Sequence, residues 1–114
     1  MKQVSAWRCV LAVDREITRY YRWWVQKELF IELEKPSWDA HITVTEGEEP
    51  RDIFKHLWKQ DNGKRIKFKY FPELIKGGPF WFVRVSCPEL YTVRYNLGLR
   101  PYYPFHITVG REKY

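Results

Sequence analysis

The sequence predicts one α+β domain made of two pseudo-symmetric lobes, about residues 1–60 and 61–114. Three observations lead to this prediction. The length of 114 residues suits a single compact domain. Both halves show a buried strand, an amphipathic helix and an alternating strand, and both alternating strands contain the tetrapeptide HITV, at 41–44 and 106–109. Because two copies are too few for a solenoid, we expect two facing lobes, each with an antiparallel sheet and external helices, separated by a cleft.

The first half opens with a nearly continuous apolar run at 5–13, which is typical of a strand buried on both faces. Asp14 then provides a helix N-cap. An amphipathic helix is predicted over about 15–30, because four large apolar residues recur there at helical spacing. These residues are Ile17, Tyr20, Tyr21 and Trp24. Pro36 ends this segment, and the alternation at 38–45 indicates a strand with one polar face.

The remaining elements follow from the same two periodicities, after an acidic loop at 46–50. We expect a short helix at 51–60, a basic strand at 64–71, a turn at 76–79 and a buried strand at 80–86. A second helix begins at Pro88 and ends at Gly98, since proline favours the first helical position and glycine the position after the last. The last predicted strand covers 105–110.

The charge balance points to an anionic partner. Lys and Arg total 20 against 14 Asp and Glu, a formal net charge of +6. A nucleic acid, a nucleotide or a membrane surface would suit this charge, and charge alone does not choose among them. The chain is 45% hydrophobic and 30% charged, which excludes a disordered tail and a membrane-spanning segment. We therefore expect a soluble globular domain.

Cysteine usage and the N-terminus predict a cytoplasmic protein. Cys9 and Cys87 lie in apolar strand-like runs and not in a CxxC pair, which favours buried free thiols over a disulfide. The apolar run after Lys2 is interrupted by Arg8 and has no small-residue cleavage site, so it does not resemble a signal peptide. We also expect the protein to be a monomer.

The two HITV strands carry residues suited to proton transfer. Residues i and i+2 of a strand share a face, so His41 stands beside Thr43, and His106 beside Thr108. If the lobes face each other, all four side chains converge on one cleft. Imidazole has an unperturbed pKa of about 6.5, so one copy can act as base and another as acid at neutral pH. Two threonine hydroxyls can donate to nonbridging phosphate oxygens, and phosphodiester cleavage then needs no metal or cofactor.

Two H-x-T motifs in alternating strands resemble the two-histidine (2H), or LigT-like, phosphoesterase superfamily. The resemblance covers the whole chain in outline, and only the tetrapeptides at 41–44 and 106–109 are specific to it. It implies a bilobal α+β fold with a cleft between the lobes as active site. It also implies an RNA, oligonucleotide or cyclic nucleotide substrate, with a 2′,3′-cyclic phosphate, a 2′-5′ linkage or a cyclic oligonucleotide as the target. His41 and His106 would be the catalytic pair, and Thr43 and Thr108 would hold the phosphate.

Further candidates for substrate binding lie near the second motif. Tyr102 and Tyr103, between two prolines, are suited to stacking on bases, and Trp81 is a third aromatic candidate. Arg111 follows the motif strand and is suited to contact a phosphate. A row of basic residues is either a polyanion surface or the ordinary solvent face of a sheet. These residues are Arg65, Lys67, Lys69 and Arg84.

Three other interpretations remain open at this stage. A zinc site made of His41, His106 and His56 would need further ligands, and only Asp39 stands near a motif at ligand spacing. His56 lies off its helix's apolar stripe and reads as a solvated residue. A catalytically inactive RNA- or nucleotide-binding domain of the same fold is the second alternative. A basic adaptor that acts through protein contacts is the third.

Overall fold

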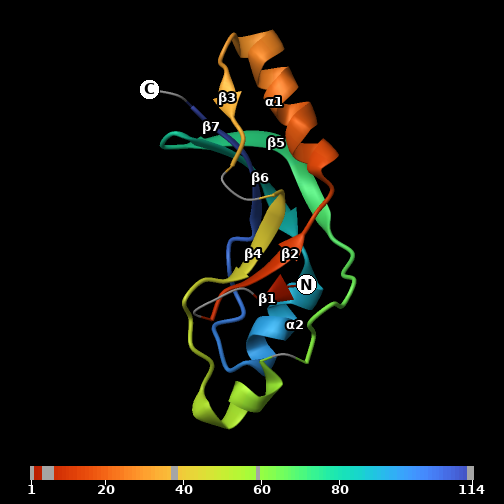
Figure 1. Ribbon diagram of the computed structural model, residues 1–114, viewed down its shortest axis with the longest axis vertical. Helices are drawn as coiled ribbons and strands as arrows, with labels where there is room; N and C mark the ends of the chain where they lie inside the picture. The colour runs from red at the N-terminus through yellow and green to blue at the C-terminus, as the bar shows by residue number, and fades with distance from the viewer. Residues whose placement is uncertain (1, 4–6, 37–38, 59, 113–114) are drawn as a thin grey trace.

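The computed structural model describes residues 2–3, 7–36, 39–58 and 60–112. Residues 5–6 and Trp38, which belong to the predicted strands at 5–13 and 38–45, lie outside the described residues. The molecule is elongated, with principal extents of 50 × 26 × 22 Å, and α1 and α2 lie towards its opposite ends (Figure 1). Helices combined with an antiparallel sheet confirm the α+β class.

All strands belong to one antiparallel sheet. They are β1 (Lys2–Gln3), β2 (Cys9–Ala12), β3 (Leu33–Glu34), β4 (His41–Thr45), β5 (Lys69–Gly77), β6 (Phe80–Ser86) and β7 (His106–Glu112). The order is β1-β2-β4-β7-β6-β5, and β3 also pairs with β7. The sequence predicts a separate sheet in each lobe. The strands of the two halves instead join into one sheet, because the two motif strands β4 and β7 pair directly with each other.

Both helices begin at the expected signals, and α2 also ends near its expected glycine, whereas α1 ends at Leu29 with Phe30 as a left-handed C-cap, before Pro36. In α1 (Arg15–Leu29), the Asp14 carboxylate accepts a hydrogen bond of 2.9 Å from the Glu16 amide, as the N-cap prediction requires. In α2 (Pro88–Asn96), the chain turns after the last helical residues through Gly98 at φ +73°. The short helix predicted at 51–60 is the 3₁₀ helix η1 (Asp52–Leu57). Among the described residues there is no helix with the length and apolar character that a membrane crossing requires.

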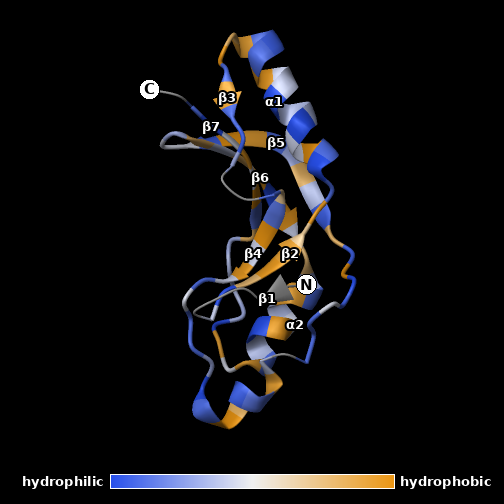
Figure 2. Ribbon diagram, in the orientation of Figure 1, coloured by the Kyte–Doolittle hydropathy of each residue, from blue (hydrophilic) through white to orange (hydrophobic). Residues whose placement is uncertain are grey.

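Both helices pack on the same face of the sheet. Val25 of α1 and Leu90 of α2 are fully buried in one cluster with Ile42 of β4 and Ile107 of β7. Figure 2 shows the corresponding apolar residues along β2 and β4, and mixed hydrophilic and hydrophobic turns in α1. Cys9 and Cys87 are buried free thiols, as expected. The two helices α1 and α2 therefore leave the opposite face of the central strands to the described loop segments and to solvent.

Each helix is also tied to the motif strand of the other half by an arginine. The Arg22 guanidinium of α1 donates a hydrogen bond of 2.9 Å to the Val109 carbonyl in β7. The Arg94 guanidinium of α2 donates one of 2.8 Å to the Val44 carbonyl in β4. Both carbonyls belong to the fourth residue of an HITV tetrapeptide. In each half, the helix arginine therefore contacts the equivalent backbone carbonyl in the motif strand of the other half.

The strand predicted at 64–71 is wrong in position, since β5 runs over Lys69–Gly77. Ile66 is buried and Phe68 is half-buried, so the alternation reflects an extended segment packed on the core without a strand partner. Pro72 lies inside β5, where the register with β6 shifts between Tyr70 and Leu74. An irregularity accommodates a residue without an N–H group, and this allows the strand to continue through the proline.

The other element boundaries differ by small amounts. The turn predicted at 76–79 is limited to Gly78 and Pro79, because β5 continues through Gly77. The last strand, predicted at 105–110, extends to Glu112 because β3 supplies a pairing partner for Arg111 and Glu112. The two-residue strand β3 is not predicted from the sequence, since it is too short to show a period.

Candidate active site

The register of the two central strands orients both motifs. β4 and β7 are antiparallel, with Ile42 directly opposite Ile107. Opposite residues of an antiparallel pair point to the same face of the sheet. Both isoleucines have no exposed surface, so that shared face is the core. The residues on either side of each isoleucine must therefore point to the opposite face, the one without helices.

Four side chains consequently form a square on that face. Continuing the pairing one residue in each direction sets His41 opposite Thr108 and Thr43 opposite His106. Opposite Cβ atoms in such pairs lie about 4.5–5.5 Å apart, and diagonal ones about 7–8 Å. The two imidazoles occupy one diagonal and the two hydroxyls the other. All four residues are half-buried, so they are held by neighbours and still reach the surface.

Both imidazoles are oriented by the same backbone contact. Nδ1 of His41 lies 2.7 Å from the carbonyl oxygen of Asp39, and Nδ1 of His106 lies 2.9 Å from that of Pro104. A carbonyl oxygen only accepts, so each Nδ1 carries a proton and donates it. In the neutral ring the lone pair is then on Nε2. The same contact thus leaves Nε2 of each histidine as the nitrogen that can exchange a proton with a substrate.

A pocket of about 260 Å³ opens beside this square. Its lining comprises Arg8, Glu34, Lys35, Pro36, His41, Phe80, Thr108 and Arg111. His41 and Thr108 line it together, in agreement with their opposite positions in the two strands. Three cationic side chains face one carboxylate in the lining, so the pocket is positively charged overall. Arg8 also forms an ion pair of 2.9 Å with Glu46.

A family model described as "2H-SAK: Swiss Army Knife, 2H phosphoesterase domain" matches residues 9–114. The match includes both HITV strands and nearly the whole chain. The chain belongs to the 2H phosphoesterase family. Membership indicates phosphodiester hydrolysis in general. No curated protein and no solved structure gives a significant match.

Within this 2H phosphoesterase domain, β6 borders the square next to His106. Arg84 is the direct register partner of His106, and Phe82 is that of Thr108, so both point to the same face. The Phe82 ring lies 5.2 Å from the imidazole of His106, centroid to centroid. Arg84 forms an exposed ion pair of 3.2 Å with Glu73. Within the basic row of Arg65, Lys67, Lys69 and Arg84, Arg84 is paired with a motif histidine.

The substrate-binding candidates of the sequence lie in different surroundings. Arg111 lines the pocket beside His41. Trp81 donates its indole N–H to Glu112 at 2.9 Å. Tyr103 packs under the Arg94 guanidinium, 4.3 Å from its ring centroid, and burial raises the pKa of its hydroxyl. Tyr102 has 81% of its surface exposed.

A metal centre finds no support in the side-chain arrangement. Among the residues that the structure describes, no three His, Cys, Asp or Glu side chains gather closely enough to hold a metal ion. His56 is exposed on η1, in agreement with its interpretation as a solvated residue. The square instead offers two imidazoles, which are suited to proton transfer, and two hydroxyls, which are suited to hydrogen bonding with phosphate.

Several site residues are not predicted from the sequence. Lys35 reaches the pocket because β3 pairs with β7, and a two-residue strand gives no periodic signal. The backbone carbonyls of Asp39 and Pro104 are missed because any residue type supplies a carbonyl. Arg8 has a usable signal, since a single arginine that interrupts an apolar strand requires a partner.

Proposed function

We propose that this chain is a metal-independent phosphodiesterase that acts on a nucleotide or RNA phosphodiester, with His41 and His106 as the general acid–base pair. The observation that carries the proposal is the register of Ile42 opposite Ile107, which turns both H-x-T motifs to the face opposite the two helices. The common Nδ1–carbonyl contact of the two imidazoles adds to it. Membership in the 2H phosphoesterase family supplies the reaction class.

The reaction is a displacement at phosphorus. Nε2 of one histidine takes the proton of the attacking water or ribose hydroxyl as the new O–P bond forms. Nε2 of the other histidine donates its proton to the leaving oxygen as the old P–O bond breaks. Attacking and leaving oxygens stand on opposite sides of phosphorus in an in-line displacement, so acid and base must be separated. A diagonal arrangement of the imidazoles satisfies this requirement.

The hydroxyls and the basic residues stabilise the negative charge that develops on the phosphate. Thr43 and Thr108 occupy the other diagonal and donate to the two nonbridging oxygens. Arg111 and Lys35 of the adjoining pocket neutralise the substrate. Tyr102 is the aromatic residue that we propose for stacking on a base, because 81% of its surface is exposed. Tyr103 and Trp81 pack against the hydrophobic core, so in this proposal they support the fold through their contacts with Arg94 and Glu112.

The two halves of the chain, 1–60 and 61–114, are in this proposal copies of one ancestral unit in a single domain. The support is the shared order of β2, α1 and β4 against β6, α2 and β7. The exchanged arginine contacts to Val44 and Val109 support it independently. Each half then contributes one histidine and one threonine to the same phosphorus centre. The cytoplasmic location and the monomeric state expected from the sequence remain part of the proposal.

A substrate panel in excess EDTA tests the proposed function. The panel contains a 2′,3′-cyclic nucleotide, a 2′-5′ linked oligoadenylate, a cyclic oligonucleotide and bis-p-nitrophenyl phosphate, with products resolved by mass spectrometry. Turnover of at least one substrate in EDTA, lost in the His41→Ala/His106→Ala variant, is the expected result. Binding without turnover of any substrate would instead identify an inactive nucleotide-binding domain.

A further inference from the structure

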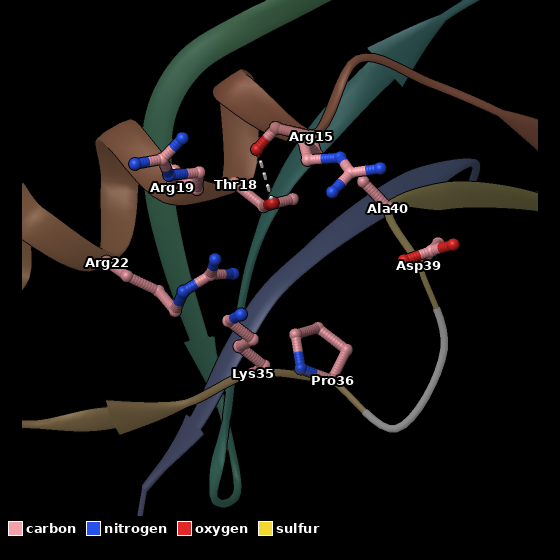
Figure 3. Close-up of a pocket in the computed structure, with 8 residues that line it drawn as sticks. All are labelled: Arg15, Thr18, Arg19, Arg22, Lys35, Pro36, Asp39 and Ala40. Atoms are coloured by element: carbon pink, nitrogen blue, oxygen red, sulfur yellow. Dashed lines mark hydrogen bonds between the residues drawn. The ribbon is translucent and has the colours of Figure 1, made fainter.

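A second, larger pocket adjoins the candidate active site. It has a volume of about 460 Å³ and lies between α1 and the residues 35–36 and 39–40 (Figure 3). Its lining comprises Arg15, Thr18, Arg19, Arg22, Lys35, Pro36, Asp39 and Ala40. Lys35 and Pro36 also line the pocket of His41, so the two pockets share a wall. Asp39 links them as well, because its carbonyl accepts the hydrogen bond from Nδ1 of His41.

The lining of this basic pocket is strongly cationic. Three arginines and one lysine line it together with one carboxylate, that of Asp39, and Arg19 also forms an ion pair of 2.7 Å with Glu16. In Figure 3 the Arg22 guanidinium and the Lys35 ammonium point into the same hollow, from α1 and from the opposite wall. Like charges gathered around a common space repel one another, and the repulsion is relieved when an anion enters. The cationic lining therefore favours an anionic ligand in this pocket.

Arg22 and Arg94 make equivalent backbone contacts in the two halves, but their charged neighbours differ. Arg94, the counterpart of Arg22, donates to both carboxylate oxygens of Glu48 at 2.7 Å. Among the described residues, no carboxylate lies within ion-pairing distance of Arg22. Burial, and then the charge of Arg19, lower the pKa of Arg22, which reflects this lack of compensation. An open volume takes the place that Glu48 occupies beside Arg94.

We propose that this basic pocket holds a second phosphate group of the substrate, so that the site takes an oligonucleotide in preference to a mononucleotide. The inference rests on the proposed function, because it takes the histidine pair as the place of the scissile phosphate. Arginine guanidinium groups bind phosphate oxygens in paired hydrogen bonds, and Arg15 and Arg22 offer two such groups. Arg19 adds a third guanidinium to the lining, although its Nη1 also donates to Glu16 at 2.7 Å. The second phosphate is either an internal diester or a terminal monoester of the same strand.

Binding to an inactive enzyme tests the inference without relying on turnover. Calorimetry with the His41→Ala/His106→Ala variant uses adenosine trinucleotides with and without a 5′-phosphate, and adenosine monophosphate as the short ligand. Adding Arg15→Gln and Arg19→Gln removes two exposed cations of the pocket. We expect trinucleotide affinity to fall by about tenfold or more, as the loss of a charge-assisted phosphate contact requires. The fall is confined to the 5′-phosphorylated ligand if a terminal monoester is bound.

The matched control removes the same net charge elsewhere. Lys27→Gln and Lys69→Gln alter an exposed lysine at the far end of α1 and another at the start of β5. Thermal melts establish that each variant is folded. An equal loss of affinity in the two pairs, or no loss in either, would overturn the inference. In otherwise wild-type protein, the ratio of kcat/KM for trinucleotide over mononucleotide should fall only for the Arg15/Arg19 pair.

The two proposals fail separately. If no substrate of the panel is cleaved in EDTA while the arginine pair still weakens trinucleotide binding, the proposed function is wrong and the basic pocket stands as a phosphate site. If a substrate is cleaved with the same preference for length in the wild type and the Arg15→Gln/Arg19→Gln variant, the pocket proposal is wrong and the catalytic assignment stands.

Discussion

The two motif strands are held by the same contact, and the two arginines that make it lie in opposite electrostatic surroundings. Arg94 has 1% of its side chain exposed, and Glu48 neutralises it within the fold. It also donates to the Arg100 carbonyl at 2.8 Å, so the guanidinium is almost fully paired. Arg22 is half-buried beside three further cations, in a pocket open to solvent. The Arg94 contact therefore stabilises the fold, whereas the charge of Arg22 is available to the ligand proposed for the basic pocket.

The difference shows how far the repeat extends. The HITV tetrapeptides, the Nδ1 contacts of both histidines and the helix arginines are common to the two halves. The neighbours are not, since Phe82 and Arg84 flank His106 whereas Lys35 and Arg8 lie near His41. We therefore expect equal dependence of the reaction on both motifs and unequal effects outside them.

The largest expected effect is symmetric. His41→Ala and His106→Ala should each lower kcat/KM by about 10²–10⁴-fold, because each removes one partner of the proton transfer. His56→Ala is the matched control, since this histidine is exposed on η1, and its rate should equal the wild-type rate. A single variant that keeps the wild-type rate would show that its strand supplies no catalytic group.

The next effect is asymmetric and concerns stability. Arg94→Met leaves Glu48 partly buried without its partner and should lower the free energy of unfolding by about 3–5 kcal/mol. Arg22→Met loses one hydrogen bond to a carbonyl and relieves repulsion, so its cost should be about 1 kcal/mol or less. Urea unfolding measures both values. Equal losses would contradict the distinction drawn between the two arginines.

A smaller, again symmetric effect is expected at the threonines. Thr43→Ala and Thr108→Ala should each lower kcat/KM by about tenfold to a few hundredfold, because one neutral donor to the transition state is lost. Serine at either position keeps the hydroxyl and should restore most of the rate. Wild-type rates in both alanine variants would reduce the threonines to strand-forming residues.

The smallest expected effect is a pH dependence of stability that arises from the Arg94–Glu48 ion pair. Hydrogen bonds from Arg94 hold the pKa of Glu48 below its ordinary value, against the opposing effect of burial. A lowered folded-state pKa stabilises the protein above the ordinary value, and this contribution is lost as the pH falls through the folded-state value. The stability gap between wild type and Glu48→Gln should thus be constant near neutral pH and close in acid. Urea midpoints between pH 7 and pH 3 measure it, and a gap that widens in acid would contradict the ion pair.

The square of two histidines and two threonines is the part of the candidate site that the sequence predicts best. Period-2 alternation decides which residues share a face, so His41 with Thr43 and His106 with Thr108 follow directly from it. Their convergence depends on β4 pairing with β7, a long-range contact that no local pattern specifies. The repeated tetrapeptide anticipates it only through the assumption of symmetry.

The parts that were not predicted depend on contacts between distant segments. Ile66 and Phe68 alternate like a strand, although the ladder with β6 begins only at Lys69. Arg94 lies four residues after Leu90 on the buried stripe of α2, a position that indicates a buried ion pair. The partner Glu48 comes from a loop of several acids, and sequence alone does not distinguish among them.

The central claim is that two imidazoles act on one phosphorus as acid and base, and the pH profile of kcat/KM in excess EDTA tests it most directly. The account predicts a bell-shaped profile for the wild type, because one ring must be neutral and the other protonated. Each single His→Ala variant should retain a low rate and lose one limb of the pH profile. The limb lost in His41→Ala should be the one that His106→Ala keeps, and the reverse. A profile with the same two limbs in all three proteins, or activity that disappears with EDTA, would contradict it.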